Sequence, residues 1–190
     1  MAPRPLMNRP FDLAYFTFFA IHILATLFVD LQALYPQDWT PSPINLIPEW
    51  YIEFSGDPLI AGAMGFIDAR DPTKWIWIKS FMWAEALFQL PVFILGLRAL
   101  YRDDQKIYPL LLIYAASSTT TMIPCVWTVL AVPRGTKAVL GITLTSEQLT
   151  TLLTSYVPFL LVTATMTVDM AQRLARLVNQ ALALNNEKKL

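Results

Sequence analysis

Four long apolar segments constrain this chain more than any other feature of its sequence. They cover residues 13–35, 75–100, 107–132 and 149–170. Each reaches the roughly 20 residues that a helix needs to cross the hydrocarbon core of a bilayer. Because backbone polar groups in that core must be satisfied within the protein, each segment is expected to be helical. The sequence therefore predicts an all-α membrane protein, a bundle of four transmembrane helices.

The composition agrees with this fold class and excludes several others. Of the 190 residues, 55% are hydrophobic and 15% are charged, whereas soluble domains carry about 25% charged residues. The 14 basic residues balance the 14 acidic ones, so no net charge indicates nucleic-acid binding. Cys125 is the single cysteine, which excludes an intrachain disulfide and a cysteine-based metal cluster. We expect no metal ion and no cofactor.

The segments divide the chain into a short N-terminus (1–10), a four-helix domain (11–172) and a basic tail (173–190). The part after Arg176, with its Asn, Gln, Glu and Lys residues, is expected to be solvated and mobile. The first segment is too long for a signal peptide, so we expect it to be retained. The loop at 36–74 is rich in proline and acidic residues. It is too long for a tight turn, and Trp50–Phe54 is a candidate for a short helix lying against the membrane.

The distribution of basic residues predicts the orientation in the membrane. Four spans put both termini and the loop at 101–106 on one side, which carries most of the basic residues: Arg4, Arg9, Arg98, Arg102, Lys106, Arg173, Arg176, Lys188 and Lys189. The other side carries fewer, in longer loops: Arg70, Lys74, Lys79, Arg134 and Lys137. By the positive-inside rule the termini are cytosolic and the long first loop is lumenal.

Two carboxyl groups lie inside the predicted spans, Asp30 in the first and Glu85 in the second. A charge there costs about 2.5–3.5 kcal/mol on insertion scales and usually faces the interior of the bundle. From the predicted helix ends, Asp30 and Glu85 lie roughly 8 and 15 Å below the lumenal rim, at 1.5 Å per residue. Two carboxyls close together in a low dielectric cannot both ionise easily, so one is expected to hold a proton. Such a pair suits an amine or a sterol hydroxyl; alternatively it only joins helices by hydrogen bonds.

Other polar residues share helical faces with these two. His22 and Thr26 precede Asp30 at intervals of four residues, and Gln89 lies one turn beyond Glu85. A stripe of small polar residues runs along the third span, and an aromatic and polar face along the fourth: Ser117, Ser118, Thr121, Cys125 and Thr128, then Tyr156, Phe159 and Thr163. We expect His22 and Phe159 to belong to a ligand-binding site together with the two carboxyls. Alternatively, the stripe serves helix packing and His22 is a structural hydrogen-bond donor.

Prolines stand inside three of the spans: Pro91, Pro124 and Pro158. Each removes a backbone donor and tends to kink its helix. We therefore expect kinked helices, which would splay the bundle and open a cavity, although proline is also common in membrane helices generally.

Several motifs together resemble one family. They are the run from His22 to Ala33; Trp50-Tyr51 with Asp57-Pro58-Leu59; Lys79-Ser80-Phe81 with Glu85 to Pro91; Thr120 to Pro124; and Tyr156-Val157-Pro158-Phe159. In this order they resemble the sigma-2 receptor family, also called the transmembrane protein 97 family. That family belongs to the EXPERA group, whose relatives include the emopamil-binding sterol isomerase. A fungal branch is described as an efficient mitochondria targeting-associated protein.

The resemblance implies a multi-pass protein of the endoplasmic reticulum membrane, a homodimer that binds sterols and cationic amphiphilic ligands. It implies that Asp30 meets the ligand amine and that Glu85 hydrogen-bonds to Asp30. The positions that match residues near the family's cavity are Gln89, Thr121, Tyr156 and Tyr51, and Asp57 matches a position important for folding. Phe159 stands where the family has tyrosine, and the loop between Leu59 and Trp75 is longer here. The C-terminus lacks a clean dilysine retrieval signal.

Three functions are consistent with these observations. The first is a non-enzymatic binder of sterols or lipids that regulates intracellular sterol transport and cholesterol homeostasis, with a Niemann-Pick type C cholesterol transporter as a candidate partner. The second is a sterol Δ8–Δ7 isomerase, in which His22, Asp30 and Glu85 supply acid and base. The third, suggested by the fungal branch alone, is an assembly or targeting factor for membrane or mitochondrial proteins. The closer resemblance to the receptors favours the first.

Overall fold

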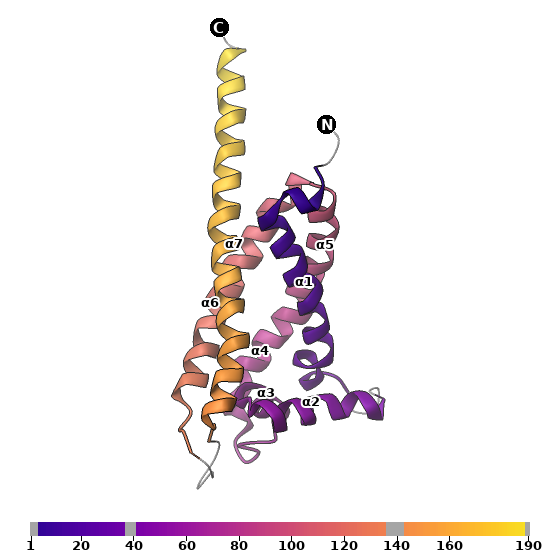
Figure 1. Cartoon of the computed structure of the whole chain (residues 1–190), viewed down its shortest axis with the longest axis vertical. Coiled ribbons are helices and arrows are strands. Elements are labelled where there is room, and N and C mark those ends of the chain that lie inside the picture. Colours follow the sequence, from indigo (N-terminus) through magenta and orange to yellow (C-terminus); the bar gives the residue numbers. More distant parts are fainter. Residues whose placement is uncertain (1–3, 37–40, 136–142, 189–190) are drawn as a thin grey trace.

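The structure, a computed structural model, describes residues 4–36, 41–135 and 143–188. Within these residues every regular element is a helix, and no strand is present. Four helical stretches are long and apolar enough to cross a membrane: Pro10–Ala33, Thr73–Tyr101, Gln105–Ala131 and Ser146–Glu187. Both termini lie at one end of the bundle (Figure 1). The predicted fold class, four apolar spans in an all-α protein, is confirmed.

The first span is not one continuous α-helix. After the short turn η1 (Leu6–Asn8), α1 runs from Pro10 to Phe28, and its proline at the first turn is pre-set for a helix. Val29 then leaves helical geometry (φ −123°, ψ −66°), and a 3₁₀ turn, η2 (Asp30–Ala33), follows. The expected continuous helix to residue 35, with Asp30 on its ridge, is therefore wrong: Asp30 begins the 3₁₀ turn.

The second span changes helix type in its middle. It is built from the 3₁₀ turn η4 (Pro72–Trp75), α4 (Ile76–Ala84), the π-helical turn η5 (Glu85–Gln89) and α5 (Leu90–Tyr101). Pro91 lies in the first turn of α5, where a missing N–H is tolerated best. A π turn inserted into a helix is frequent at functional sites, and this one begins at Glu85.

The third and fourth spans are unbroken. A 3₁₀ turn, η6 (Gln105–Ile107), leads into α6 (Tyr108–Ala131), and α7 covers Ser146–Glu187. Thr145 and Gln148 form a capping box at the start of α7, which satisfies two otherwise unpaired N–H groups. Pro124 and Pro158 lie inside these helices without interrupting them. Of the three prolines expected to kink the spans, only Pro91 accompanies a change of helix type.

The fourth helix is longer than predicted. The part expected to be mobile after Arg176 instead continues α7 to Glu187, and Figure 1 shows this helix extending well past the other spans. The reason is local, since residues 171–187 are rich in Ala, Leu, Arg and Gln, which favour helix. Lys137 and Lys189, used in the topology prediction, lie outside the described residues, as do residues 1–3 of the predicted N-terminal segment and the last two residues of the tail.

The long first loop contains two short helices, as expected. They are α2 (Ser42–Ser55) and α3 (Pro58–Met64), and both lie at the end of the bundle opposite the termini (Figure 1). Gly56 (φ 68°) and Gly65 (φ 81°) end these helices in the left-handed conformation, which costs glycine little. The turn at Gly56 brings Asp57 to the start of α3.

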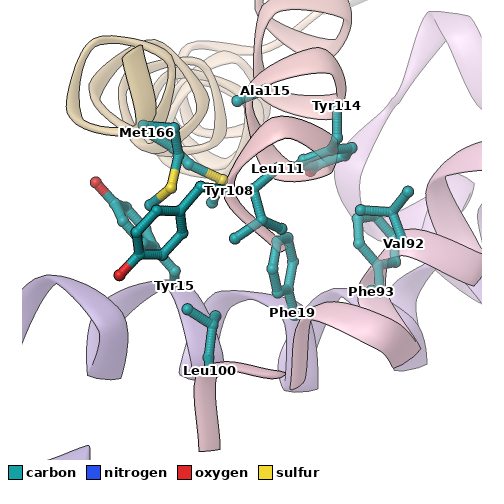
Figure 2. Close-up of a cluster of buried hydrophobic side chains, with 11 residues drawn as sticks. Tyr15, Phe19, Val92, Phe93, Leu100, Tyr108, Leu111, Tyr114, Ala115 and Met166 are labelled. Carbon is teal, nitrogen blue, oxygen red and sulfur yellow. The ribbon is translucent and has the colours of Figure 1, made fainter. Parts of the chain in front are cut away.

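The main core lies toward the terminal end of the bundle. Its buried residues come from α1, α5, α6 and α7 (Figure 2): Tyr15, Phe19, Val92, Phe93, Leu100, Tyr108, Leu111, Tyr114, Ala115, Met166 and Met170. The rings of Phe19, Phe93 and Tyr114 have centroids 5.3–5.5 Å apart, within the range of favourable aromatic pairs. A second cluster, around Leu59, Met82 and Cys125, packs α3 against α4 and α6. A cavity lies beside these clusters.

Candidate functional site

The cavity is lined by residues of all four spans, with α2 and α3 at its outer end, and has a volume of about 360 Å³. That lies within the range of cavities that hold small organic ligands. All eight residues that the sequence proposed for ligand binding line it: His22, Asp30, Tyr51, Glu85, Gln89, Thr121, Tyr156 and Phe159. The structure therefore brings them together from the four spans and α2.

An ionisable cluster stands at one wall of the cavity. His22, Asp30 and Glu85 each offer one ligand atom, and these atoms lie within 4.8 Å of one another. The hydroxyl of Thr26 donates a hydrogen bond to Oε1 of Glu85 at 2.5 Å, and Nε2 of His22 is 3.7 Å from the same oxygen. One carboxylate oxygen of Glu85 is thus held by Thr26, from the first span. The expected proximity of the two carboxyls is found, although each lies on an irregular turn rather than on an α-helix.

Asp30 differs from Glu85 in having no hydrogen-bond or ion-pair partner in the part of the chain that the structure describes. Its side chain lines the cavity, and within residues 4–36, 41–135 and 143–188 it forms no hydrogen bond or ion pair. A carboxyl inside a transmembrane span is costly unless it is paired. The cavity therefore contains an acceptor that remains available for a ligand.

Aromatic rings surround His22. Its ring centroid lies 4.6 Å from that of Phe159 and 5.4 Å from those of Phe18 and Phe93. Phe159 also meets Phe18 edge to face at 5.1 Å. Because Phe159 has no hydroxyl, the fourth helix contributes a purely apolar surface at this point. This wall suits the hydrocarbon part of a ligand, or the face of a cation.

The third span adds a small polar group. Ser118 donates to Oε1 of Gln89 at 3.3 Å, and Thr121 donates to the carbonyl of Ser118 at 3.2 Å. The Thr121 hydroxyl is thus turned toward its own helix, as is common in apolar surroundings. Of the predicted stripe, Ser118, Thr121 and Cys125 line the cavity. These positions follow helical spacing, so the face itself was predicted.

Asp57 holds the outer end of the cavity together. It is fully buried and caps α3 by accepting from the N–H groups of Leu59 and Ile60 at 2.9 and 3.3 Å. Its other oxygen accepts from the hydroxyls of Tyr51 and Tyr156 at 2.9 and 2.8 Å. Burial raises the pKa of Asp57, and these four hydrogen bonds act in the opposite direction. The Asp57 carboxyl thus joins α2, α3 and α7. It also fixes the positions of Tyr51 and Tyr156 in the cavity, whose hydroxyls donate to Asp57.

Much of the lining was not identified from the sequence. Apolar residues form most of the remaining surface: Ile21, Ala25, Val29, Leu59, Ile60, Ile78, Phe81, Met82 and Met122, together with Ser155. The residues on the spans could not be separated from lipid-facing ones by type, since both classes are apolar. Met122 could have been found, because it follows Ser118 by four residues on the same face.

The arrangement can bind a ligand with one cationic or hydrogen-bond-donating group and an apolar body. The side chains of His22, Asp30 and Glu85 can also donate and accept protons within one part of the cavity, as acid–base chemistry requires. The three donor atoms of His22, Asp30 and Glu85 are close enough to hold a metal ion as well, and nitrogen and oxygen donors suit several divalent metals.

Comparison with known proteins identifies the family. Residues 43–170 match EXPERA (EXPanded EBP superfamily). Sigma intracellular receptor 2 of Macaca fascicularis is 34% identical over 150 residues, covering 76% of this chain and 78% of the relative. The Xenopus tropicalis protein of that name is 31% identical over 155 residues, covering 81% and 84%. The human one is 34% identical over 114 residues, covering 60% and 58%.

The region that matches the family model includes most, but not all, of the cavity residues proposed from the sequence. It contains Tyr51, Glu85, Gln89, Thr121, Tyr156 and Phe159, whereas His22 and Asp30 precede it. The chain belongs to the EXPERA family and, within it, to the group of the sigma-2 receptors.

Proposed function

We propose that the cavity binds a sterol or related lipid, and also cationic amphiphiles, without chemical conversion of the ligand. The observation that carries this proposal is Asp30, a carboxyl inside a span that faces the cavity without a partner among the described residues. A ligand amine or hydroxyl would supply the missing donor, and an amine would also supply the counter-charge. The apolar remainder of the lining suits a sterol body.

The proposal extends to the setting in the cell. The protein would regulate sterol transport or homeostasis from the endoplasmic reticulum membrane, as a homodimer with cytosolic termini. The relatives' name, sigma intracellular receptor 2, supports an intracellular membrane and a receptor-like role. A Niemann-Pick type C cholesterol transporter remains the candidate protein partner, on the strength of the family resemblance alone.

A sterol isomerase is the second candidate, and one observation favours it. His22, Asp30 and Glu85 converge within 4.8 Å, so an acid could protonate a sterol double bond while a second group removes a proton. A site that stabilises the resulting cation would also bind amines, so amine binding does not separate the two functions. An assembly or targeting factor is supported by the fungal resemblance only.

One experiment tests sterol binding and turnover together. Purified protein is incubated with a photoreactive Δ8-sterol, then irradiated, and a parallel sample is extracted for product analysis. We expect crosslinking within the cavity lining, loss of crosslinking when a cationic amphiphile is added, and recovery of the Δ8-sterol unchanged. Formation of the Δ7 product would establish the isomerase instead. Crosslinking that the amphiphile does not reduce would contradict a shared cavity.

A further inference from the structure

A second cavity lies at the end of the bundle that carries the termini, and it shares no lining residue with the first. It has a volume of about 1110 Å³ and opens between the N-terminal part of α1, the start of α6 and the outer half of α7. Figure 1 shows α7 continuing beyond the start of α1 on this side. Its residues take no part in the proposed sterol site.

Four arginines line this cavity: Arg4, Arg9, Arg173 and Arg176. The acidic lining residues are Asp12 and Asp169, so the lining carries a net charge of +2. Asp103, which pairs with Arg4 at 2.9 Å, reduces this excess by one. The lining residues and Asp103 together carry a net charge of +1.

Three of the arginines have structural partners. Asp12 is buried between Arg9 and Arg173, with N–O distances of 2.5 and 2.6 Å. Arg173 also pairs with Asp169 at 2.7 Å. These ion pairs tie α1 to α7 and use both oxygens of Asp12, so neither acidic group is left to repel an anion strongly.

Arg176 is different, because this network does not include it. It lines the cavity, it is exposed, and it forms no hydrogen bond or ion pair with any residue of the described ranges. Gln172 and Gln180 line the cavity one turn before and one turn after it. A guanidinium flanked by amide side chains is a favourable arrangement for a phosphate group, which accepts several hydrogen bonds at once.

The side of this second cavity that lies farther from the termini, along α1 and α7, is apolar. It includes Phe11 and Val168, which are 55% and 57% exposed, with Ala164 beyond them. Val168 precedes Arg176 by eight residues, which is about 12 Å along a helix. The cavity therefore combines a cationic end near the termini with an apolar end inside the span, which is the arrangement of a phospholipid at the edge of a bilayer.

We infer that this cavity binds a phosphate group that carries hydrocarbon chains, namely the headgroup of an anionic phospholipid, with Arg176 as its principal cationic contact. The phosphate lies at Arg176, and the chains follow the apolar side past Val168. A soluble phosphate ester has the same headgroup chemistry but would make no use of the apolar side.

The test measures how ligands protect the purified, detergent-solubilised full chain against heat. Cys125, the only cysteine and a buried one, reports unfolding by its reaction with a fluorogenic maleimide. Phosphatidic acid is titrated against phosphatidylcholine, and glycerol 3-phosphate provides the headgroup without chains. The variants are Arg176→Gln and, as a matched control, Arg102→Gln. Arg102 is also exposed at the terminal end and unpaired within the described residues, but it does not line the cavity.

We expect phosphatidic acid, and not phosphatidylcholine, to raise the unfolding temperature of the wild-type chain and of Arg102→Gln. Arg176→Gln should need at least about five times more phosphatidic acid for the same rise, because one charge-assisted contact is lost. Equal titrations for the two variants would overturn the assignment, as would equal protection by phosphatidylcholine. Protection by glycerol 3-phosphate at the same concentration would overturn the lipid as the source, leaving a soluble phosphate ester.

Discussion

Removing the Asp57 carboxylate is predicted to destabilise the protein more than most single substitutions. Asp57→Ala loses four hydrogen bonds, two to backbone N–H groups and two to the hydroxyls of Tyr51 and Tyr156. At about 1–1.5 kcal/mol for each bond, the free energy of unfolding should fall by about 4–6 kcal/mol. Asp57→Asn keeps an oxygen to cap α3, since Asn and Asp cap about equally well. It replaces the charged acceptor of both tyrosine hydroxyls by an amide, so those two contacts are lost and the cost should be about 2–3 kcal/mol.

The maleimide reaction of Cys125 measures these differences as unfolding temperatures. For a chain of this length, about 2–4 °C is lost per kcal/mol, so we expect a fall of about 5–10 °C for Asp57→Asn and of more than about 10 °C for Asp57→Ala. Tyr51→Phe, which removes one of the four contacts, should lie between Asp57→Asn and the wild type. Asp68→Asn is the control, because Asp68 is a surface carboxyl paired with Lys74, and such pairs contribute at most about 1 kcal/mol.

Two results would refute this account of Asp57. If Asp57→Asn unfolds at the wild-type temperature, the tyrosine hydroxyls do not depend on the charge of the carboxylate. If Asp57→Asn and Asp57→Ala unfold at the same temperature, the cap on α3 contributes nothing, and Asp57 acts only through the tyrosines.

Three further predictions concern topology and the ionisable cluster. Tags at residues 1 and 190 should be cleaved by protease in sealed microsomes, because basic residues favour the cytosolic side; protection of both would invert the topology. Glu85→Gln should retain amine binding within about threefold, since an amide still accepts from Thr26 and donates toward Asp30, whereas Glu85→Ala should lose both affinity and stability. Equal losses for a folded Gln variant and the Ala variant would instead assign the ligand's counter-charge to Glu85. Amine binding should be unchanged after EDTA treatment and dialysis, because the carboxyls themselves meet the amine; loss that added Zn²⁺ restores would show that His22, Asp30 and Glu85 act through a metal ion.

The spans could be predicted because bilayer thickness sets the length of each apolar run, and only helices satisfy their backbone inside it. The positions of Asp30 and Glu85 along the chain then placed both in the lumenal half of the membrane. That both face the interior follows from the rule for carboxyls in membrane spans, whereas Gln89 and Thr121 were assigned to the same cavity by family resemblance.

The irregular turns could not be predicted, because they depend on contacts between segments. The π turn at Glu85–Gln89 changes the helical register by one residue, and the sequence hints at it only through Pro91. The break at Val29 has no proline or glycine to mark it. For the same reason the hydrogen bond from Thr26 to Glu85 was not foreseen, since it joins positions 59 residues apart.

The Asp57 cluster and the length of α7 illustrate two other limits. Asp57 was singled out by family resemblance, but its tyrosine partners come from α2 and α7, which only the fold brings together. The continuation of α7 to Glu187 was missed because a polar composition was interpreted as a sign of mobility. The propensity of Ala, Leu, Arg and Gln for helix was the better guide there.

The central claim is that Asp30 provides the counter-charge for a ligand in the sterol cavity. The direct measurement is the equilibrium dissociation constant of a radiolabelled cationic amphiphile for Asp30→Asn, with Asp68→Asn as the control and the Cys125 unfolding temperature to establish that both variants are folded. An amide keeps the shape of the carboxylate but offers only a dipole to the amine. We expect the affinity of Asp30→Asn to fall by at least about 100-fold, equivalent to about 2.8 kcal/mol, while Asp68→Asn binds as the wild type does. A folded Asp30→Asn variant that binds the amphiphile with unchanged affinity would contradict the claim.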